Sequence, residues 1–184
     1  MTQNKKIIAV TGGIGSGKST ACRILSDLSY PVFSCDEVYC ELLENKDFIK
    51  KLEDGLGKVT GEDGLLDRKA LSAKVFSDKE VKKTLESISH PAIMEQLLAK
   101  AKLAQSDLVF CEVPLLFENG YEDLFDDVIV IMRPLKERIE AVEKRSGLSE
   151  KEVLNRIASQ YDYSKVEEKS YKIVYNNGNI DSLH

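Results

Sequence analysis

The feature that most constrains this chain is a glycine-rich turn between a short apolar run and an amphipathic segment. Lys6 to Thr11 (KIIAVT) has the β-branched composition of a buried strand, and Lys18 to Leu28 carries apolar residues at helical spacing. Between them, GGIGSGKS at 12–19 fits the pattern GxxxxGK followed by serine or threonine. Loop amides and the helix N-terminus then point at one anion, so the sequence predicts a site for nucleotide phosphates.

The motif also assigns roles to single side chains. Lys18 can reach the β- and γ-phosphates of the nucleotide, and the Ser19 hydroxyl is placed to bind Mg²⁺. We therefore expect Ser19 to be the metal ligand and ATP to be bound by Gly13, Ile14, Gly15, Ser16, Gly17, Lys18, Ser19 and Thr20. The motif does not by itself separate a kinase from a GTPase or another ATPase.

The guanine-reading signals of a GTPase are incomplete. In Asn45-Lys46-Asp47 the aspartate of an NKxD motif comes one position early, within a segment expected to be helical. Asp54 to Gly57 fits DxxG, but no strand precedes it. Both near-matches are interpreted as solvated surface.

Composition limits the class of protein further. The chain has 184 residues, 42% of them hydrophobic, enough for one core with a subdomain or lid. A formal net charge of −5 argues against nucleic acid as a partner. The four cysteines have no CxxC spacing, and no apolar run approaches a membrane span. We expect a soluble cytoplasmic protein without a membrane partner, as a monomer or weak homo-oligomer.

Further apolar runs predict an α/β fold with a parallel sheet. Leu108 to Val113 and Asp127 to Met132 are nearly continuous apolar runs, typical of strands buried on both faces. Short strands are also expected at Pro31 to Ser34 and Lys172 to Tyr175. From Asp36 to Ser106 no strand is expected; helix starts occur instead at Asp67, at a capping box Ser77 to Glu80, and at Pro91 before AIMEQLLAKAK. The glycine-rich segment from Gly55 to Gly64 is expected to separate parts of this helical stretch.

Two charged helices are expected after the strand at Asp127 to Met132. One begins at Pro134 and runs to Arg145, where Gly147 ends it, and the other is capped by Ser149 and runs to Gln160.

Asp36 has two interpretations on residue type alone. It follows the strand at Pro31 to Ser34, and ligands of open α/β sheets bind at the carboxyl ends of strands. A carboxylate there can orient or deprotonate an attacking hydroxyl. Equally, Asp36 can be the N-cap of a helix starting at Glu37.

Several blocks of the sequence resemble dephospho-coenzyme A kinases. They are VTGGIGSGKST at the start, GLLDRKAL at 64–71, ISHPAI at 88–93, EVPLLFENG at 112–120, KRSGLSEKEVLNRIASQ at 144–160 and IVYNNG at 173–178. The blocks follow the order of that family and cover most of the chain, and HPAI followed by PLLFE is specific to it. The resemblance implies a three-layer P-loop kinase fold with core 1–35, 107–133 and 171–184, a helical acceptor-binding subdomain at about 36–106, and a helical lid at about 134–170.

The resemblance also implies a reaction. The γ-phosphate of ATP would pass to the ribose 3′-hydroxyl of dephospho-coenzyme A, with Asp36 matching the catalytic aspartate of the family. Lys18 and a lid arginine would stabilise charge on the transferred group. Arg145, just before a Ser-Gly hinge, is the leading candidate, while Arg138 and Arg156 are as readily surface ion-pair partners.

The same resemblance implies the remaining site residues. Asn176 and Gly178 would contact the adenine of ATP, although an asparagine turn is also ordinary without function. Independently of the resemblance, Glu112 ends an expected buried strand, where an acidic residue can bind Mg²⁺ through water, although the family has no fixed acid at this position. The acceptor would be bound by Asp36, His90, Pro114, Leu115, Leu116 and Glu118.

The sequence departs from the family pattern at a few positions. Ser34 and Cys40 stand where family members often carry an acid and an arginine, and Ser170-Tyr171 replaces an Ala-Asp pair. Two alternatives therefore stay open: another P-loop kinase acting on a nucleotide, shikimate or gluconate, and an ATP-binding regulator without turnover.

Overall fold

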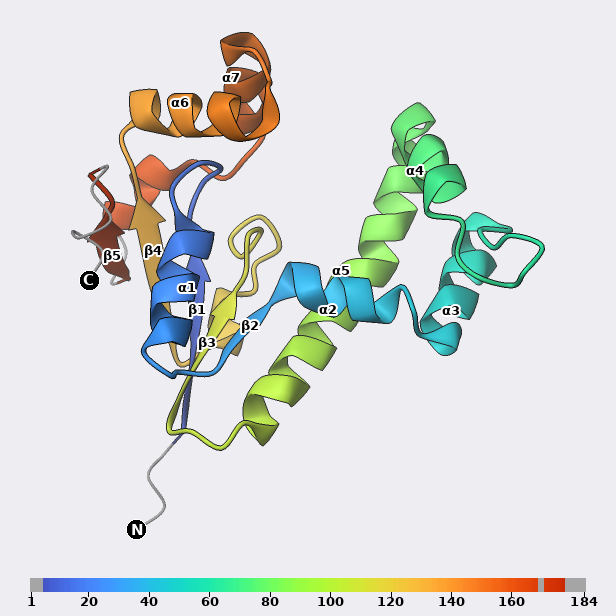
Figure 1. Cartoon of the computed structure of the whole chain (residues 1–184), viewed down its shortest axis with the longest axis horizontal. Coiled ribbons are helices and arrows are strands. Elements are labelled where there is room, and N and C mark those ends of the chain that lie inside the picture. The colour runs from blue at the N-terminus through green and yellow to red at the C-terminus, as the bar shows by residue number, and fades with distance from the viewer. Residues whose placement is uncertain (1–4, 169–170, 178–184) are drawn as a thin grey trace. The chain divides into compact units, whose positions relative to one another are not determined.

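The computed structural model describes residues 5–168 and 171–177, with side chains given outside 167–168 (Figure 1). Its centre is a five-stranded sheet in the order β2-β3-β1-β4-β5. Strand β1 pairs in parallel with both β3 and β4, and β4 pairs in parallel with β5. The strands are β1 (Lys6–Thr11), β2 (Val32–Ser34), β3 (Leu108–Glu112), β4 (Asp127–Met132) and β5 (Lys172–Tyr175). The predicted α/β fold with a parallel sheet is confirmed.

The chain divides into two compact units. The first comprises Met1–Phe33 and Ala101–His184, and the second comprises Ser34–Lys100. The first unit holds the sheet together with α1 (Lys18–Asp27), α6 (Leu135–Ser146), α7 (Glu150–Ala158) and the short 3₁₀ helices at Glu122–Leu124 and Tyr163–Glu168. None of the helices in the described part of the chain is long and apolar enough to span a bilayer.

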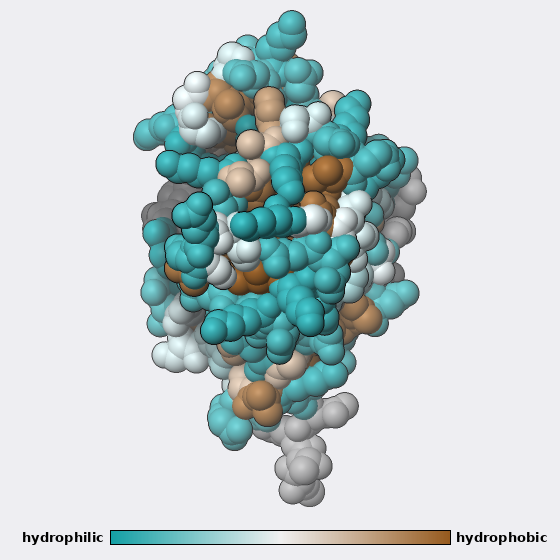
Figure 2. Space-filling view, turned by 90° about the vertical axis from the view of Figure 1, so that its right-hand side faces the viewer, coloured by the Kyte–Doolittle hydropathy of each residue, from teal (hydrophilic) through white to brown (hydrophobic). Residues whose placement is uncertain are grey.

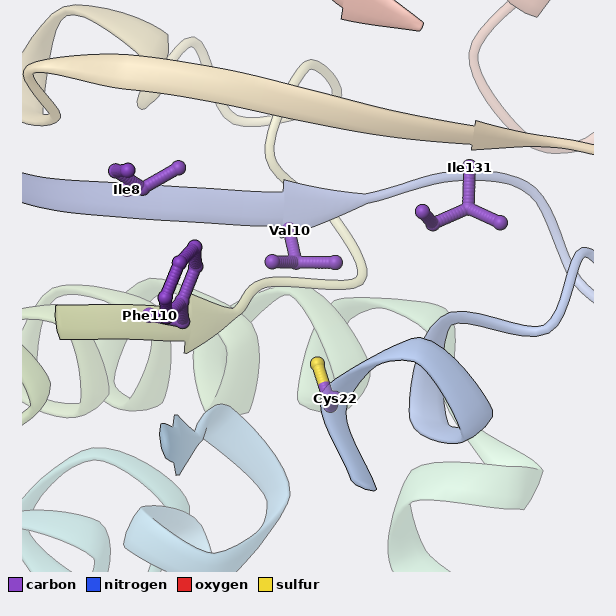
Figure 3. Packing of buried hydrophobic residues seen from close by; sticks show 5 residues of the cluster. All are labelled: Ile8, Val10, Cys22, Phe110 and Ile131. Atoms are coloured by element: carbon purple, nitrogen blue, oxygen red, sulfur yellow. The ribbon is translucent and has the colours of Figure 1, made fainter. Parts of the chain in front are cut away.

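The core of the first unit lies between α1 and the sheet. Figure 3 shows Ile8 and Val10 of β1, Phe110 of β3, Ile131 beyond them on β4, and Cys22 of α1 gathered in one cluster. All five side chains are buried. In β1 every residue after Lys6 is buried, in agreement with its nearly continuous apolar sequence. Because parallel strands are covered on both faces, apolar composition rather than alternation was the correct signal.

The second unit is helical, with α2 (Cys35–Leu42), α3 (Lys46–Leu56), α4 (Arg68–Ser77) and α5 (Lys79–Leu103), the last of which continues into the first unit. Residues 36–106, all of them described, contain no strand beyond an isolated antiparallel bridge between Thr60 and Leu66. The glycine-rich loop is shorter than expected, because Gly55 still belongs to α3. Figure 2 shows a mostly hydrophilic face on which apolar atoms form separate small patches.

Two predicted helix starts in this unit are wrong. Pro91 does not begin a helix but lies inside α5, and His90 before it is helical too. The buried positions Ser89, Met94 and Leu97 keep helical spacing across the proline, so packing outweighs the backbone hydrogen bond that proline removes.

The second error concerns the cap between α4 and α5. The side chain of Asp78, not Ser77, accepts the backbone N–H of Glu80 at 2.8 Å. Ser77 is the last residue of α4, and its hydroxyl donates to the Lys74 carbonyl. Two adjacent residues with capping side chains left the start of the helix ambiguous in the sequence.

Asn45 belongs to the NKxD near-match that we interpret as structural, and a substitution there tests this interpretation. Its side chain accepts the N–H groups of Asp47 and Phe48 at 2.9 and 3.1 Å and caps α3. We expect Asn45→Ala to lower the free energy of unfolding by about 1 kcal/mol, the usual loss for a cap. Urea denaturation measures this change, and Asn45→Ser, which can still cap, is the control. A change in nucleotide preference with unchanged stability would contradict the structural role.

Candidate active site

The loop between β1 and α1 is shaped by glycines at positive φ. Gly12, Gly15 and Gly17 have φ of 147°, 75° and 99°. A Cβ on Gly12 would lie 2.3 Å from the Ile131 carbonyl oxygen, so a side chain there would collide with β4. Gly17 is the N-cap of α1 and offers no side-chain acceptor to the helix. The first amides of α1 are therefore left for an anion.

Lys18 lies over the same loop. Its ammonium donates to the carbonyl oxygens of Gly12 at 2.6 Å and Gly13 at 3.2 Å. Burial lowers the pKa of Lys18; the carboxylate of Glu112 opposes this shift, and the charges of Arg138 and Arg145 add to it. The amine is thus a desolvated cation at the position where the motif predicts the β- and γ-phosphates.

Ser19 and Glu112 meet at the edge of this loop. The Ser19 hydroxyl donates to Glu112 Oε1 at 2.8 Å, although the two residues are far apart in the sequence. Glu112 is the last residue of β3, the neighbour of β1. Among the described residues no group of three or more His, Cys, Asp or Glu side chains is suited to hold a metal. A hydroxyl and a carboxylate fit Mg²⁺ that takes its other ligands from phosphates and water.

Arg138 of α6 contacts the loop directly. Its Nε donates to the Ile14 carbonyl oxygen at 2.9 Å, and its guanidinium fills the space where a Gly13 side chain would stand. Burial lowers the pKa of Arg138, against a smaller opposing effect of Tyr163. The leading arginine of the sequence analysis, Arg145, lies exposed in the last turn of α6, and Arg156 lies exposed in the last turn of α7.

Two amide side chains also bind the loop backbone. Gln160 Oε1 accepts the Ile14 N–H at 2.8 Å, and Asn176 Nδ2 donates to the Ser16 carbonyl oxygen at 2.9 Å. Asn176 is buried and follows β5, so the nucleotide-binding residue expected there is brought to the loop. Gly178, expected beside it, lies outside the described residues. Gln160 was not singled out in the sequence, because its partner is distant and no local pattern marks it.

The segment from 114 to 118 packs against the chain that follows α7. Leu116 is fully buried, whereas Leu115 is exposed and Pro114 is intermediate. Glu118 Oε1 accepts the Tyr161 N–H at 2.9 Å. Of the predicted acceptor residues in the first unit, Pro114, Leu115 and Glu118 are therefore accessible at least in part, while Leu116 has the environment of a core residue.

Aromatic rings reinforce the same packing. The ring of Phe117 lies 4.8, 6.0 and 5.2 Å from those of Tyr161, Tyr163 and Tyr171, measured between centroids. Burial raises the pKa of Tyr163 to about 12, with the hydroxyl next to Thr11 at the start of the loop. These tyrosines were also missed in the sequence.

Asp36 and His90 belong to the second unit. Asp36 is exposed in the first turn of α2, and its backbone N–H donates to the Ser34 hydroxyl at 3.2 Å. Ser34 is thus the N-cap, and the interpretation of Asp36 as the cap is wrong. The Asp36 carboxylate is therefore not occupied in capping the helix. His90 is partly buried within α5.

From the lowered pKa of Lys18 we predict that the protein takes up protons when it binds a nucleotide. Because burial lowers its pKa, Lys18 loses its proton at a lower pH than a solvent-exposed lysine, and bound phosphates favour the charged form as the pH rises toward that pKa. ADP binding should then take up protons, measured by calorimetry in two buffers of different ionisation enthalpy. Lys18→Arg, which stays charged, should remove this uptake. Equal uptake in both proteins, or none in the wild type, would refute the role of Lys18.

Comparison with known proteins gives one family. The family model described as dephospho-CoA kinase matches residues 6–182. A dephospho-CoA kinase of Thermus thermophilus is 38% identical over 180 residues, covering 96% of this chain and 86% of the relative. One of Wolinella succinogenes is 32% identical over 179 residues, covering 96% and 88%.

Solved structures agree with the sequence comparisons. The dephospho-CoA kinase from Campylobacter jejuni is 30% identical, with a TM-score of 0.71 over 97% of this chain and 92% of that one. A shikimate kinase from Acinetobacter baumannii, 14% identical with a TM-score of 0.55 over 98% and 89%, shares the fold alone.

Proposed function

The chain belongs to the dephospho-CoA kinase family, and we propose that it transfers the γ-phosphate of ATP to the ribose 3′-hydroxyl of dephospho-coenzyme A. The observation that carries the proposal is the β1–α1 loop, in which uncapped helix amides and the ammonium of Lys18 converge. The family match selects dephospho-coenzyme A over the acceptors of other P-loop kinases.

ATP is bound on the residues of the loop. The loop from Gly13 to Thr20 surrounds the phosphates with its amides, except the Ile14 N–H, which donates to Gln160. Lys18 moves from the carbonyls of Gly12 and Gly13 to the β- and γ-phosphates. The Asn176 side chain donates to the carbonyl oxygen of Ser16 in the loop, and the Asn176 backbone would contact the adenine. Because the lysine already lies beside the loop, its transfer to phosphate needs only a side-chain movement.

Mg²⁺ is held by Ser19 and, directly or through water, by Glu112. The 2.8 Å hydrogen bond between them supports this assignment, because it places two hard oxygen ligands side by side. The ion would neutralise charge between the β- and γ-phosphates. Ser19 would hold the ion through a lone pair of Oγ, while its hydroxyl proton remains on Ser19 and donates to Glu112.

Asp36 orients the 3′-hydroxyl and accepts its proton. Its carboxylate, free of the cap of α2, follows directly on the strand β2 whose carboxyl end faces ligands in this class of sheet. His90, Pro114, Leu115, Leu116 and Glu118 bind the acceptor in the same proposal, with Leu116 acting through packing. The predicted cytoplasmic location and weakly associated or monomeric state stay predictions.

Coupled ADP release tests both the acceptor and the role of Asp36. With ATP and Mg²⁺, we expect turnover with dephospho-coenzyme A but not with adenosine, AMP or shikimate. Asp36→Asn should lower kcat by about 10² to 10⁴, the usual contribution of general acid–base catalysis. Glu37→Gln is the matched control, since it removes the same charge from the same exposed helix turn.

The other outcomes of this assay separate the alternatives. Turnover with a different acceptor would assign the chain to a sister kinase. ATP binding without turnover on any acceptor would favour an ATP-binding regulator. Equal losses in Asp36→Asn and Glu37→Gln would show a general electrostatic effect and refute Asp36 as the base.

Arg145 stabilises the transferred phosphoryl group in our proposal, whereas Arg138 holds the loop. The charge of Arg145 already acts on Lys18 and lowers its pKa, and its exposed side chain is free to move. We expect Arg145→Met to lower kcat by about 10² with little change in thermal stability. Arg138→Met should instead lower stability and raise KM for ATP, because it breaks the bond to Ile14. Steady-state kinetics and thermal melts of both variants measure this; the reverse pattern would exchange the two roles.

A further inference from the structure

Ile14 is held by the α6–α7 region through its backbone and its side chain. Its carbonyl oxygen accepts from Arg138 Nε at 2.9 Å, and its N–H donates to Gln160 Oε1 at 2.8 Å. Its side chain packs against the buried cluster of Ile139, Val142 and Val153, which joins α6 to α7. One residue in the middle of the phosphate loop is therefore part of the hydrophobic core of the helix pair.

Gly15, the residue after Ile14, allows the loop backbone to lie close to α6. A Cβ on Gly15 would lie 2.5 Å from the Arg138 carbonyl oxygen and 3.0 Å from Val142 Cγ2. The loop backbone thus lies directly on α6, with no room for a side chain between them. In Figure 1 the α6–α7 pair stands beside the loop that joins β1 to α1.

Gln160 is fixed on its other side as well. The next residue, Tyr161, donates its N–H to Glu118. Its ring lies tilted against Phe117 at 4.8 Å and edge-to-face with Tyr163 at 5.7 Å, measured between centroids. The backbone of Gln160 donates to the Ile157 carbonyl at the end of α7. The side chain that reaches Ile14 is therefore anchored between the helix pair and the segment that follows β3.

We propose that Gln160 is a positioning residue that joins the α6–α7 pair to the phosphate loop and holds the Ile14 amide in place for ATP binding. The proposal rests on the proposed function, because it concerns the loop that binds ATP. Without the Gln160 oxygen that accepts the Ile14 N–H, this part of the loop samples other backbone conformations, and ATP must order the loop when it binds. Through Ile14, a displacement of α6–α7 also displaces the loop, so movement of the helices and nucleotide binding are coupled.

Two substitutions separate the hydrogen bond from the charge. Gln160→Met keeps a long unbranched side chain without the amide acceptor. Gln160→Glu keeps an acceptor for the Ile14 N–H but adds a negative charge beside the site for phosphates. Gln105→Met is the control, since Gln105 is exposed and its side-chain amide donates only locally, to the Leu103 carbonyl.

The first measurement is amide hydrogen exchange of Ile14 by NMR in the protein without nucleotide. We expect exchange to become about 5- to 10-fold faster in Gln160→Met, as for the loss of one ordinary hydrogen bond, and to stay slow in Gln160→Glu and Gln105→Met. Equal exchange in wild type and Gln160→Met would overturn the proposal. This readout is independent of catalysis, so it stands or falls separately from the kinase assignment.

The second measurement separates positioning from catalysis. Gln160→Met should raise KM for ATP and the calorimetric Kd for ADP by about 5- to 10-fold, with kcat within about twofold of wild type. Gln160→Glu should weaken both more strongly, because its carboxylate repels the phosphates. A fall in kcat at unchanged KM, or wild-type nucleotide affinity in Gln160→Met despite faster Ile14 exchange, would overturn the positioning role.

Discussion

The site depends on a set of backbone amides that the protein leaves without side-chain partners. Gly17 is the N-cap of α1 and has a positive φ, a conformation that glycine adopts easily. Because it has no side chain, it brings no oxygen that would compete with an anion for the first amides of the helix. In contrast, α2 and α3 start with side chains that occupy their first amides, Ser34 and Asn45. The start of α6, at Pro134, also lacks a side-chain cap, but α1 differs from it in having the ammonium of Lys18 at its first turn. An uncapped helix start beside a cation suits an anion.

The charges around this helix start are balanced rather than simply positive. Lys18 is desolvated and lies near two arginines, and Glu112 is the largest influence that keeps it protonated. Glu112 in turn receives the Ser19 hydroxyl. In the proposed reaction, Glu112 would therefore link the two cations of phosphoryl transfer, because it favours the charged form of Lys18 and would offer an oxygen to the divalent ion. A purely cationic loop would bind phosphate but would lower the charge of its own lysine further.

The sequence predicted the elements that are local and missed the contacts that are not. The ranges of β1, β4 and β5 match the predicted strands, because each is a short apolar run with clear boundaries. Pro91 misled the prediction since its rule is local, whereas α5 is continuous through buried residues on either side. The bonds from Gln160 and Arg138 to Ile14 join residues 146 and 124 positions apart, and no spacing rule covers such pairs. The close contacts that a Cβ would disrupt are non-local too: Gly12 lies against Ile131, Gly13 and Gly15 against Arg138, and Gly17 against Asn176.

Ser34 shows how a departure from the family pattern is accommodated. At this position, where the resemblance described in the sequence analysis implies an additional acid, the Ser34 hydroxyl accepts the Asp36 N–H and starts α2. Serine and aspartate cap helices about equally well, so the replacement keeps the helix start while removing one negative charge. The proposed phosphoryl transfer depends on positioning more than on a strong base, so we expect a single correctly placed carboxylate to suffice. In this proposal the position of Ser34 has to provide the start of the helix that carries Asp36, and the serine hydroxyl provides it.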